Sequence, residues 1–208
     1  MSFNALTAII ILSFLVSCDN SFESNAGGEN VKVNAARIEE MADSAYRFIK
    51  KNNFNKNLCI LIDMSLHSGV KRFFIWDFDK DTTANSFLVS HGACENWWGK
   101  DRSRSDPGFS NKEGSHCSSL GKYAILDRGY SNWGIHIKYT LEGLDPTNKN
   151  ARSRIVVLHS WEKISDKEIY PDGTPEGWGC PAVSDNSMRV IDAKLRYIDG
   201  PVLMWIFK

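Results

Sequence analysis

The residues best suited to covalent chemistry are Cys180 and His159, which lie 21 positions apart. His159 ends the apolar run RIVVLHSW (residues 154–161), and Cys180 lies in the run GWGCPAVS (residues 177–184). A nucleophilic cysteine needs a base within hydrogen-bond reach and backbone N–H groups aimed at the developing oxyanion. Gly179 has no side chain and lets the backbone approach a substrate closely. Residue types and spacing are compatible with a cysteine–histidine dyad, but they also leave open a packed thiol, half of a disulfide and a metal ligand.

Two helices and several strands are predicted around this pair. Apolar residues at helical spacing after Asn34 indicate an N-capped amphipathic helix of about four turns. A second helix is predicted to begin after Ser184 or Asp185 and to stop before the Asp-Gly-Pro sequence at 199–201. Runs rich in β-branched and aromatic residues predict strands at residues 58–64, 72–78, 86–90, 122–126, 134–144, 153–161 and 202–207.

The expected fold class is mainly β, an α+β arrangement in which helices flank a mixed sheet or β-sandwich. Two long irregular segments, residues 91–120 and 162–180, interrupt the strands. Loops of this length in a compact domain are usually functional or disordered, and we expect these two to be ordered and to wall a cleft. With no internal repeat or inner boundary, residues 34–208 are predicted to form a single domain.

The charge balance argues against a nucleic-acid partner. The chain of 208 residues carries 25 basic and 25 acidic residues, for a formal net charge of zero. No stretch concentrates positive charge as a nucleic-acid-binding face would. A mixed, solvated surface is the simpler interpretation, and we expect a monomer.

The N-terminus has the pattern of an export signal. Residues 5–17 form an apolar run of signal-peptide length that is too short to span a membrane comfortably. The run ends in Leu-Val-Ser before Cys18, which resembles a bacterial lipobox whose cysteine becomes lipidated after cleavage. We therefore expect a signal peptide at residues 1–17, a flexible tether at residues 18–33, and a protein exported to the bacterial cell envelope, anchored by lipid to a membrane and facing the periplasm.

Export changes the interpretation of the remaining cysteines, which are Cys59, Cys94, Cys117 and Cys180. An oxidising compartment permits two disulfides among them, and the sequence does not choose between the three pairings.

Five motifs together resemble the murein L,D-transpeptidase catalytic domain family. They occur in the order and spacing of one branch of that family, and they extend over most of the chain after residue 85. The tryptophan two positions before the cysteine and the Pro-Ala-Val after it depart from the best-known members but fit this branch. The motifs are SHG (90–92), FSNKEGSHCSSLGKY (109–123), LEGLDPTNKNARSR (141–154), IVVLHSW (155–161) and GWGCPAVS (177–184).

The resemblance implies an acyl transfer on peptidoglycan stem peptides, without a cofactor or metal. Cys180 is implied as the nucleophile that forms a thioacyl-enzyme, and His159 as the general base. Backbone N–H groups near Gly179 and Cys180 would form the oxyanion site, and Ser160 or a main-chain carbonyl would orient the histidine. An amine or water would resolve the thioester, which corresponds to L,D-transpeptidation or to L,D-carboxypeptidase hydrolysis.

Several polar and aromatic residues in these motifs are candidates for binding the stem peptide. Arginine binds carboxylates in bidentate fashion, and we favour Arg152 over Arg154, which begins a predicted strand. Trp178 is the best candidate for a role in the cleft, whereas Trp133 and Trp161 are expected to serve core and cleft packing rather than to stack on sugar rings. The full set of substrate-binding candidates is His91, Asn111, Ser119, Asn148, Arg152 and Trp178.

Two other functions remain possible at this stage. The domain could be a catalytically silent murein-binding lipoprotein, and a catalytic Cys180 should differ from a silent one by a lowered thiol pKa. A zinc-dependent hydrolase could instead use the His/Cys-rich set His91, Cys94, His116 and Cys117. A disulfide between Cys94 and Cys117 is the favoured use of those two thiols in an exported protein.

Overall fold

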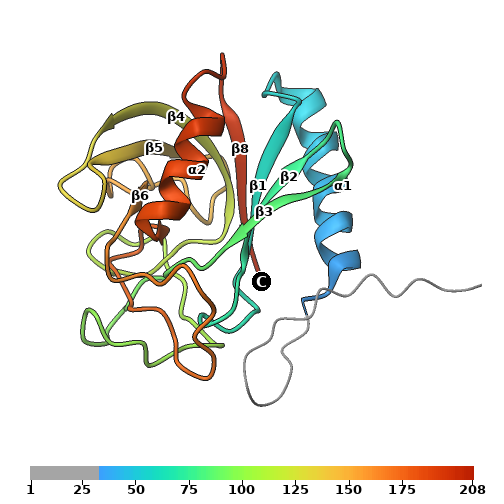
Figure 1. Ribbon diagram of the computed structural model, residues 1–208. Coiled ribbons are helices and arrows are strands. Elements are labelled where there is room, and N and C mark those ends of the chain that lie inside the picture. The colour runs from blue at the N-terminus through green and yellow to red at the C-terminus, as the bar shows by residue number, and fades with distance from the viewer. Residues whose placement is uncertain (1–32) are drawn as a thin grey trace, which may run out of the picture.

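The computed structural model describes residues 33–208 (Figure 1). The predicted signal peptide, the lipidation site Cys18 and the predicted tether up to residue 32 lie outside the described residues. Within residues 33–208, none of the helices combines the length and the apolar character that a membrane crossing requires.

One mixed sheet of eight strands forms the body of the domain. Its spatial order is β3-β2-β1-β8-β4-β5-β6-β7, in which β1 pairs in parallel with β8 and β6 in parallel with β7. The predicted α+β class is therefore confirmed. The strands are β1 (Leu58–Asp63), β2 (Phe73–Asp77), β3 (Thr82–Phe87), β4 (Gly121–Tyr130), β5 (Ile137–Gly143), β6 (Val157–Ser160), β7 (Ala182–Val183) and β8 (Val202–Phe207).

Helix α1 (Ala35–Asn52) covers one face of the sheet, at the right of Figure 1. It begins as predicted, because the side chain of Asn34 accepts a hydrogen bond from the backbone N–H of Arg37. Ile38 and Ile49 of α1 are buried in one apolar cluster with Leu61 of β1. Because side chains alternate along a strand, the neighbouring residues of β1 lie on the opposite face of the sheet, in the main core.

Helix α2 (Asp185–Leu195) packs on the main core, with Ser184 as its N-cap. Met188 and Ile191 are fully buried there. Asp192 of the same helix accepts hydrogen bonds from Arg128 Nε at 2.6 Å and from the Tyr139 hydroxyl at 2.8 Å. These contacts fix α2 against β4 and β5, and they set the position of the segment that enters the helix from Cys180.

Several strand predictions need correction. The strand expected at 153–161 begins only at Val157, because residues 151–155 form a turn that includes Arg154, and the strand expected at 122–126 extends to Tyr130. The third strand is Thr82–Phe87 and ends before the apolar residues Leu88 and Val89, which are buried outside it. The two-residue strand β7 was not predicted, because it is too short to show the alternation of apolar and polar residues that identifies a strand in sequence.

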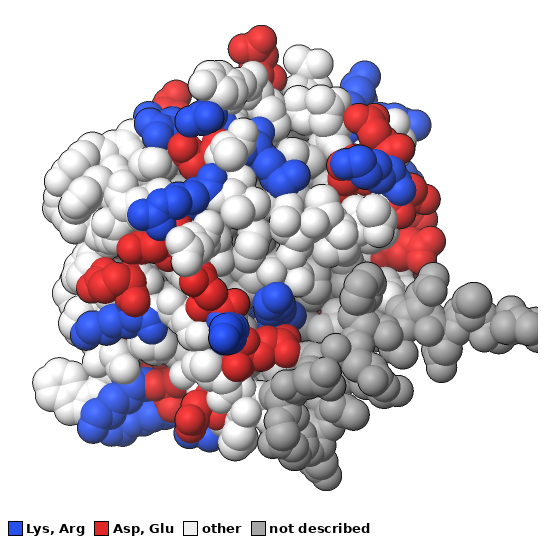
Figure 2. Space-filling view, viewed as in Figure 1, with Lys and Arg blue, Asp and Glu red and all other residues white. Residues whose placement is uncertain are grey.

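Figure 2 shows acidic and basic side chains interspersed over the face of the molecule drawn there.

Candidate active site

Cys180 and His159 line the same cavity, which has a volume of about 260 Å³. The register of the sheet explains why they meet: His159 of β6 pairs in parallel with Ala182 of β7, and Cys180 lies two positions before Ala182. Residues two positions apart in extended chain point to the same side. The remaining cavity residues are Trp98, Trp133, Trp161, Gly177, Trp178 and Ala182.

The thiol of Cys180 is free and lies over the start of β6. Its Sγ accepts a hydrogen bond from the backbone N–H of Val157 at 3.4 Å and lies 3.8 Å from the carbonyl oxygen of Ile155. Burial raises the pKa of Cys180 above 9.0, and the hydrogen bond from Val157 and the positive charge of Arg154 only partly offset that effect. This direction is opposite to the lowered pKa that is expected of an activated cysteine nucleophile.

The His159 ring is held by a backbone carbonyl. Its Nδ1 lies 2.9 Å from the carbonyl oxygen of Ser160. That oxygen can only accept, so Nδ1 carries the proton and the lone pair of the neutral ring is on Nε2. Burial lowers the pKa of His159 below 6.5, although the bond to Ser160 opposes the shift. The carbonyl of Ser160, and not its hydroxyl, is therefore the partner of the ring. The hydroxyl accepts a hydrogen bond from the backbone N–H of Ile135.

Gly179 is a position that only glycine fits. Its φ is +93°, and a Cβ built there would lie 2.4 Å from the carbonyl oxygen of Cys117. A side chain would therefore be strained and would also collide with backbone. The close approach brings the segment around Cys117 directly behind the nucleophile.

Arg154 organises that segment and was not selected from the sequence. Its guanidinium donates to the carbonyl oxygen of Ser110 at 2.9 Å, to Ser119 Oγ at 2.7 Å and to the carbonyl oxygen of Cys117 at 2.6 Å. Arg152, the preferred candidate, is exposed and pairs with Glu142 at 3.3 Å. The turn between β5 and β6 determines which arginine points inward, and no pattern in the sequence predicts that orientation.

Three polar candidates stabilise loops in this structure. Asn148 is fully buried, and its side chain bonds the backbone of Lys122 and Asp145. Asn111 bonds the backbone of Asn150 and of the residue at 146. Ser119 is 4% exposed and donates to the carbonyl oxygen of Ser110. None of the three is among the residues that line the cavity.

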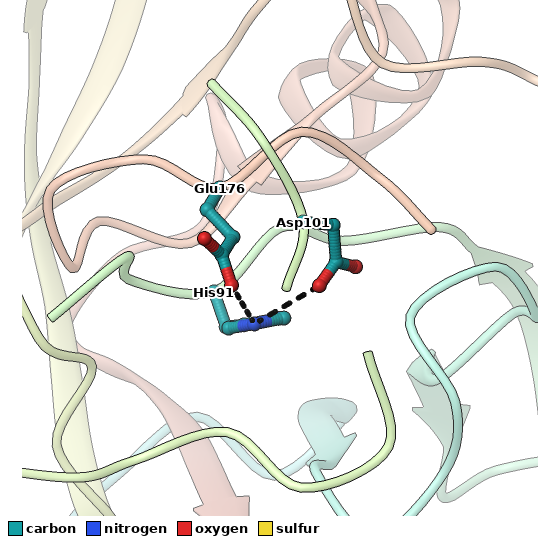
Figure 3. Close-up of side chains that lie close together, drawn as sticks. All are labelled: His91, Asp101 and Glu176. Atoms are coloured by element: carbon teal, nitrogen blue, oxygen red, sulfur yellow. Dashed lines mark hydrogen bonds and ion pairs between the residues drawn. The ribbon is translucent and has the colours of Figure 1, made fainter. Parts of the chain in front are cut away.

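His91 is also displaced from the expected cleft wall, because it is fully buried. Its Nδ1 lies 2.7 Å from Arg72 Nη2, and its Nε2 lies 3.2 Å from Glu176 Oε1 and 2.6 Å from Ser103 Oγ. Figure 3 shows His91 directed toward the carboxylates of Glu176 and Asp101. Glu176 immediately precedes Gly177, so this buried network supports the start of the nucleophile segment.

The three side chains of Figure 3 have the composition of a metal site, with potential ligand atoms within 4.8 Å of one another. The hydrogen bonds oppose that use. Arg72 is a donor only, so His91 Nδ1 must accept and the ring proton is on Nε2, which then donates to Glu176 or Ser103. A protonated nitrogen cannot ligate, and the cationic Arg72 lies beside the ring. We therefore interpret the group as a hydrogen-bond network.

A disulfide joins Cys94 to Cys117, as predicted. It removes both thiols from the zinc set considered from the sequence, which rules out that ligand arrangement. The disulfide links the loop after His91 to the segment behind Gly179. Ala93 N–H donates to the Gly177 carbonyl at 2.8 Å, and Gly177 N–H donates to the His91 carbonyl at 2.9 Å.

Four indoles line the cavity together with Cys180 and His159. Trp98 stacks on Trp161 with ring centroids 5.5 Å apart, and it also contacts Trp133 and Trp178 at 6.0 and 5.9 Å. Trp178 lies in the cavity wall as predicted and is 61% exposed. Trp133 is 44% exposed and lines the cavity, as does the buried Trp161, so both contribute to the packing of the cleft.

These features belong to a known family. A family model described as the L,D-transpeptidase catalytic domain matches residues 29–205, and the chain is a member of that family. No protein of curated function matches the sequence.

Solved structures with a similar fold are distant in sequence. The helical cell shape determining protein Pgp2 from Campylobacter jejuni has 11% identity and a TM-score of 0.46 over 73% of this chain, which spans 47% of that protein's length. An L,D-transpeptidase (residues 123–326) from Xylanimonas cellulosilytica has 11% identity and a TM-score of 0.37, with 77% of this chain and 68% of that one covered. The avibactam carbamoyl enzyme of Ldtfm has 9% identity and a TM-score of 0.42, with 91% and 73% covered.

Proposed function

We propose that this protein is a cysteine acyltransferase that acts on peptidoglycan stem peptides through a thioester on Cys180. The observation that carries the proposal is the placement of Cys180 and His159 on one cavity in a chain of the L,D-transpeptidase family. Family membership supports the substrate class, and the cavity supports the choice of nucleophile and base.

The first half of the reaction starts from neutral partners. His159 Nε2 takes the thiol proton as Sγ attacks the carbonyl carbon of the L,D-linked stem residue. Backbone N–H groups at Gly179 and Cys180 stabilise the oxyanion. The intermediate collapses when the C–N bond to the terminal D-residue breaks and His159 returns the proton to the leaving amine. A thioester on Cys180 and a free D-amino acid remain.

In the second half an amine or water attacks the thioester. His159 takes a proton from the attacking group, the C–S bond breaks, and the sulfur recovers that proton. The amine gives a cross-link, and water gives a shortened stem peptide. The raised pKa of the half-buried Cys180 thiol favours a second candidate, a catalytically silent murein-binding domain, because such a thiol needs activation by His159 before it can react.

The proposal can be tested on disaccharide-tetrapeptide muropeptides with the reduced protein from about residue 30 onward. Products are read by mass spectrometry for the parent, Cys180→Ala and His159→Gln. Cross-linked dimer or tripeptide from the parent alone supports the enzyme. Intact substrate in every sample, together with retained binding to murein sacculi, supports the silent domain.

We also propose that the protein is exported and anchored by lipid at Cys18, which the sequence pattern before that residue supports. In cells, a palmitate-type alkyne label should be incorporated into the full chain and lost in Cys18→Ser. Labelling of both proteins would contradict the anchor at Cys18, and labelling of neither would contradict lipidation altogether.

A further inference from the structure

Ile155, near the end of the turn between β5 and β6, has a backbone conformation that is unfavourable for its residue type. Its φ is +56°, in the left-handed region, where branching at Cβ crowds the backbone of an isoleucine. Among residues 33–208, Ile155 is the only β-branched residue with a positive φ. Its side chain is 71% exposed, so packing against the core does not account for an isoleucine at this position.

Two backbone hydrogen bonds hold Ile155 in this conformation. Its N–H donates to the carbonyl oxygen of Arg152 at 3.0 Å, and the N–H of Val156 donates to the carbonyl oxygen of Ala151 at 2.9 Å. This pair of bonds is the Schellman motif, in which the left-handed residue is usually glycine because glycine has no Cβ. Val156 is 4% exposed, and its burial anchors the end of the motif. The turn therefore imposes strain on Ile155 at a position where glycine would be unstrained.

The strained residue sets the contacts of the Cys180 sulfur. The carbonyl oxygen of Ile155 lies 3.8 Å from Cys180 Sγ, and because a carbonyl can only accept, the thiol directs its S–H proton toward it. The N–H of Val157 donates to the same sulfur at 3.4 Å. Both backbone groups belong to the segment whose direction is set by the dihedral angles of Ile155. Attack on a substrate requires the thiol proton to pass to His159, so the thiol must first leave the Ile155 carbonyl.

The strain raises the energy of this resting arrangement. A residue held in an unfavourable region of φ and ψ destabilises the conformation to which it belongs. Ile155 precedes β6, which begins at Val157, so the hydrogen bonds of the sheet do not hold it. Relaxation of Ile155 toward the extended conformation, which β-branched residues prefer, would turn its carbonyl away from the sulfur of Cys180. The thiol proton would then be free for His159.

We propose that Ile155 is a positioning residue whose strained backbone destabilises the resting contact between its own carbonyl and the Cys180 thiol, and thereby prepares the thiol to give its proton to His159. This inference rests on the proposed function, because it takes Cys180 as the nucleophile. Relief of the strain should stabilise the fold and slow the thiol at the same time. A purely structural role of residue 155 would change the stability and leave the reactivity of Cys180 unchanged.

The test compares substitutions that relieve the strain with one that keeps it. Ile155→Asn and Ile155→Gly tolerate the left-handed conformation, whereas the conservative Ile155→Val retains the branching at Cβ. The thermal midpoint of Ile155→Asn should rise by about 2–4 °C, and that of Ile155→Gly by less, because glycine also gains freedom in the unfolded chain. Alkylation of Cys180 by iodoacetamide at pH 8 should slow by about fivefold or more in both, and Ile155→Val should retain the parent rate.

Asp81→Gly is the control for strain relief elsewhere, because Asp81 has a φ of +52° in the turn between β2 and β3. It should leave the alkylation rate unchanged. Equal alkylation rates in the parent, Ile155→Asn and Ile155→Gly overturn the positioning role. Faster alkylation in those two variants also overturns it, because the strain would then restrain the thiol. Absence of an acyl group on Cys180 after incubation of the parent with muropeptide overturns the proposed function, whereas the alkylation rates still decide how Ile155 acts on the thiol.

Discussion

At the scale of single residues, backbone contacts hold both members of the proposed catalytic pair, Cys180 and His159. The Val157 N–H and Ile155 carbonyl hold the sulfur, and the Ser160 carbonyl holds the imidazole. Backbone groups of a paired strand are rigid, so neither side chain needs a polar side-chain partner to stay in place. The sequence could name Cys180 and His159, but it could not show that their partners are carbonyl and N–H groups, which every residue has.

The neutral state of this pair predicts the pH dependence of Cys180 alkylation. With the thiol pKa raised above 9.0, iodoacetamide should react with a rate that keeps increasing through pH 9. A thiolate already formed by transfer to His159 would instead give a plateau from acidic pH upward. The rate is followed by intact mass, and Cys180→Ala corrects for the buried Cys59, the other free cysteine of residues 33–208.

The two arginines of the 141–154 motif should differ in their effect on stability. Arg154→Met leaves the carbonyl oxygen of Cys117 without its donor and the carbonyl oxygen of Ser110 with the Ser119 hydroxyl only, and an unsatisfied buried polar group costs about 1–3 kcal/mol. Arg152→Met removes only an exposed pair with Glu142, worth about 0.5 kcal/mol. Urea unfolding of both variants measures the difference, and equal losses would show that Arg154 does not hold the segment behind Gly179.

At the scale of elements, the strands and helices were more accessible to prediction than the loops that complete the site. Strand β6 is predicted by its run of apolar residues, and the Ser184 cap of α2 is predicted by the local chemistry of the serine side chain. The burial of His91 depends on residues 72 and 176, which are distant along the chain. Long-range hydrogen bonds of this kind leave no periodicity, and a histidine in a motif looks the same whether it faces substrate or supports a loop.

The buried network beneath the nucleophile segment should depend on one oxygen of Glu176. Its Oε1 receives hydrogen bonds from Ser103 Oγ at 2.8 Å, from His91, and from the backbone N–H groups of residues 102 and 103, while the buried Oε2 has no partner. Glu176→Gln keeps the accepting oxygen and should cost little. Glu176→Ala leaves these donors unsatisfied and should lower the free energy of unfolding by about 2–3 kcal/mol.

A functional measurement separates positioning from stability alone. Below the unfolding transition, Cys180 alkylation should change in Glu176→Ala and remain close to the parent rate in Glu176→Gln. A loss of stability without any change in alkylation would mean that the network supports the fold but does not position Cys180. A large loss in Glu176→Gln would mean that the negative charge beside His91 matters more than the hydrogen bonds.

At the scale of the whole molecule, the stability should decrease as the pH falls below 6.5. Burial lowers the pKa values of His67, His91 and His159 below the ordinary 6.5, so these rings stay neutral in the folded protein. The unfolded chain takes up the protons that the folded protein does not, and the free energy of unfolding therefore rises with pH in this range. The contribution is complete above pH 6.5 and is lost as the pH falls toward the folded pKa values.

A second loss is expected below about pH 4.5. Burial would raise the pKa of Glu176, but hydrogen bonds from His91, Ser103 and residue 102 outweigh it and hold that pKa below 4.5. Thermal unfolding at pH 7.5, 6.0 and 5.0 isolates the histidine contribution, because carboxylates stay charged over that interval. His91→Gln should reduce the slope of stability against pH. A midpoint of thermal unfolding that stays constant or rises on acidification would show that the buried histidine rings are already protonated in the folded protein. His159 would then lack the neutral form that a general base requires.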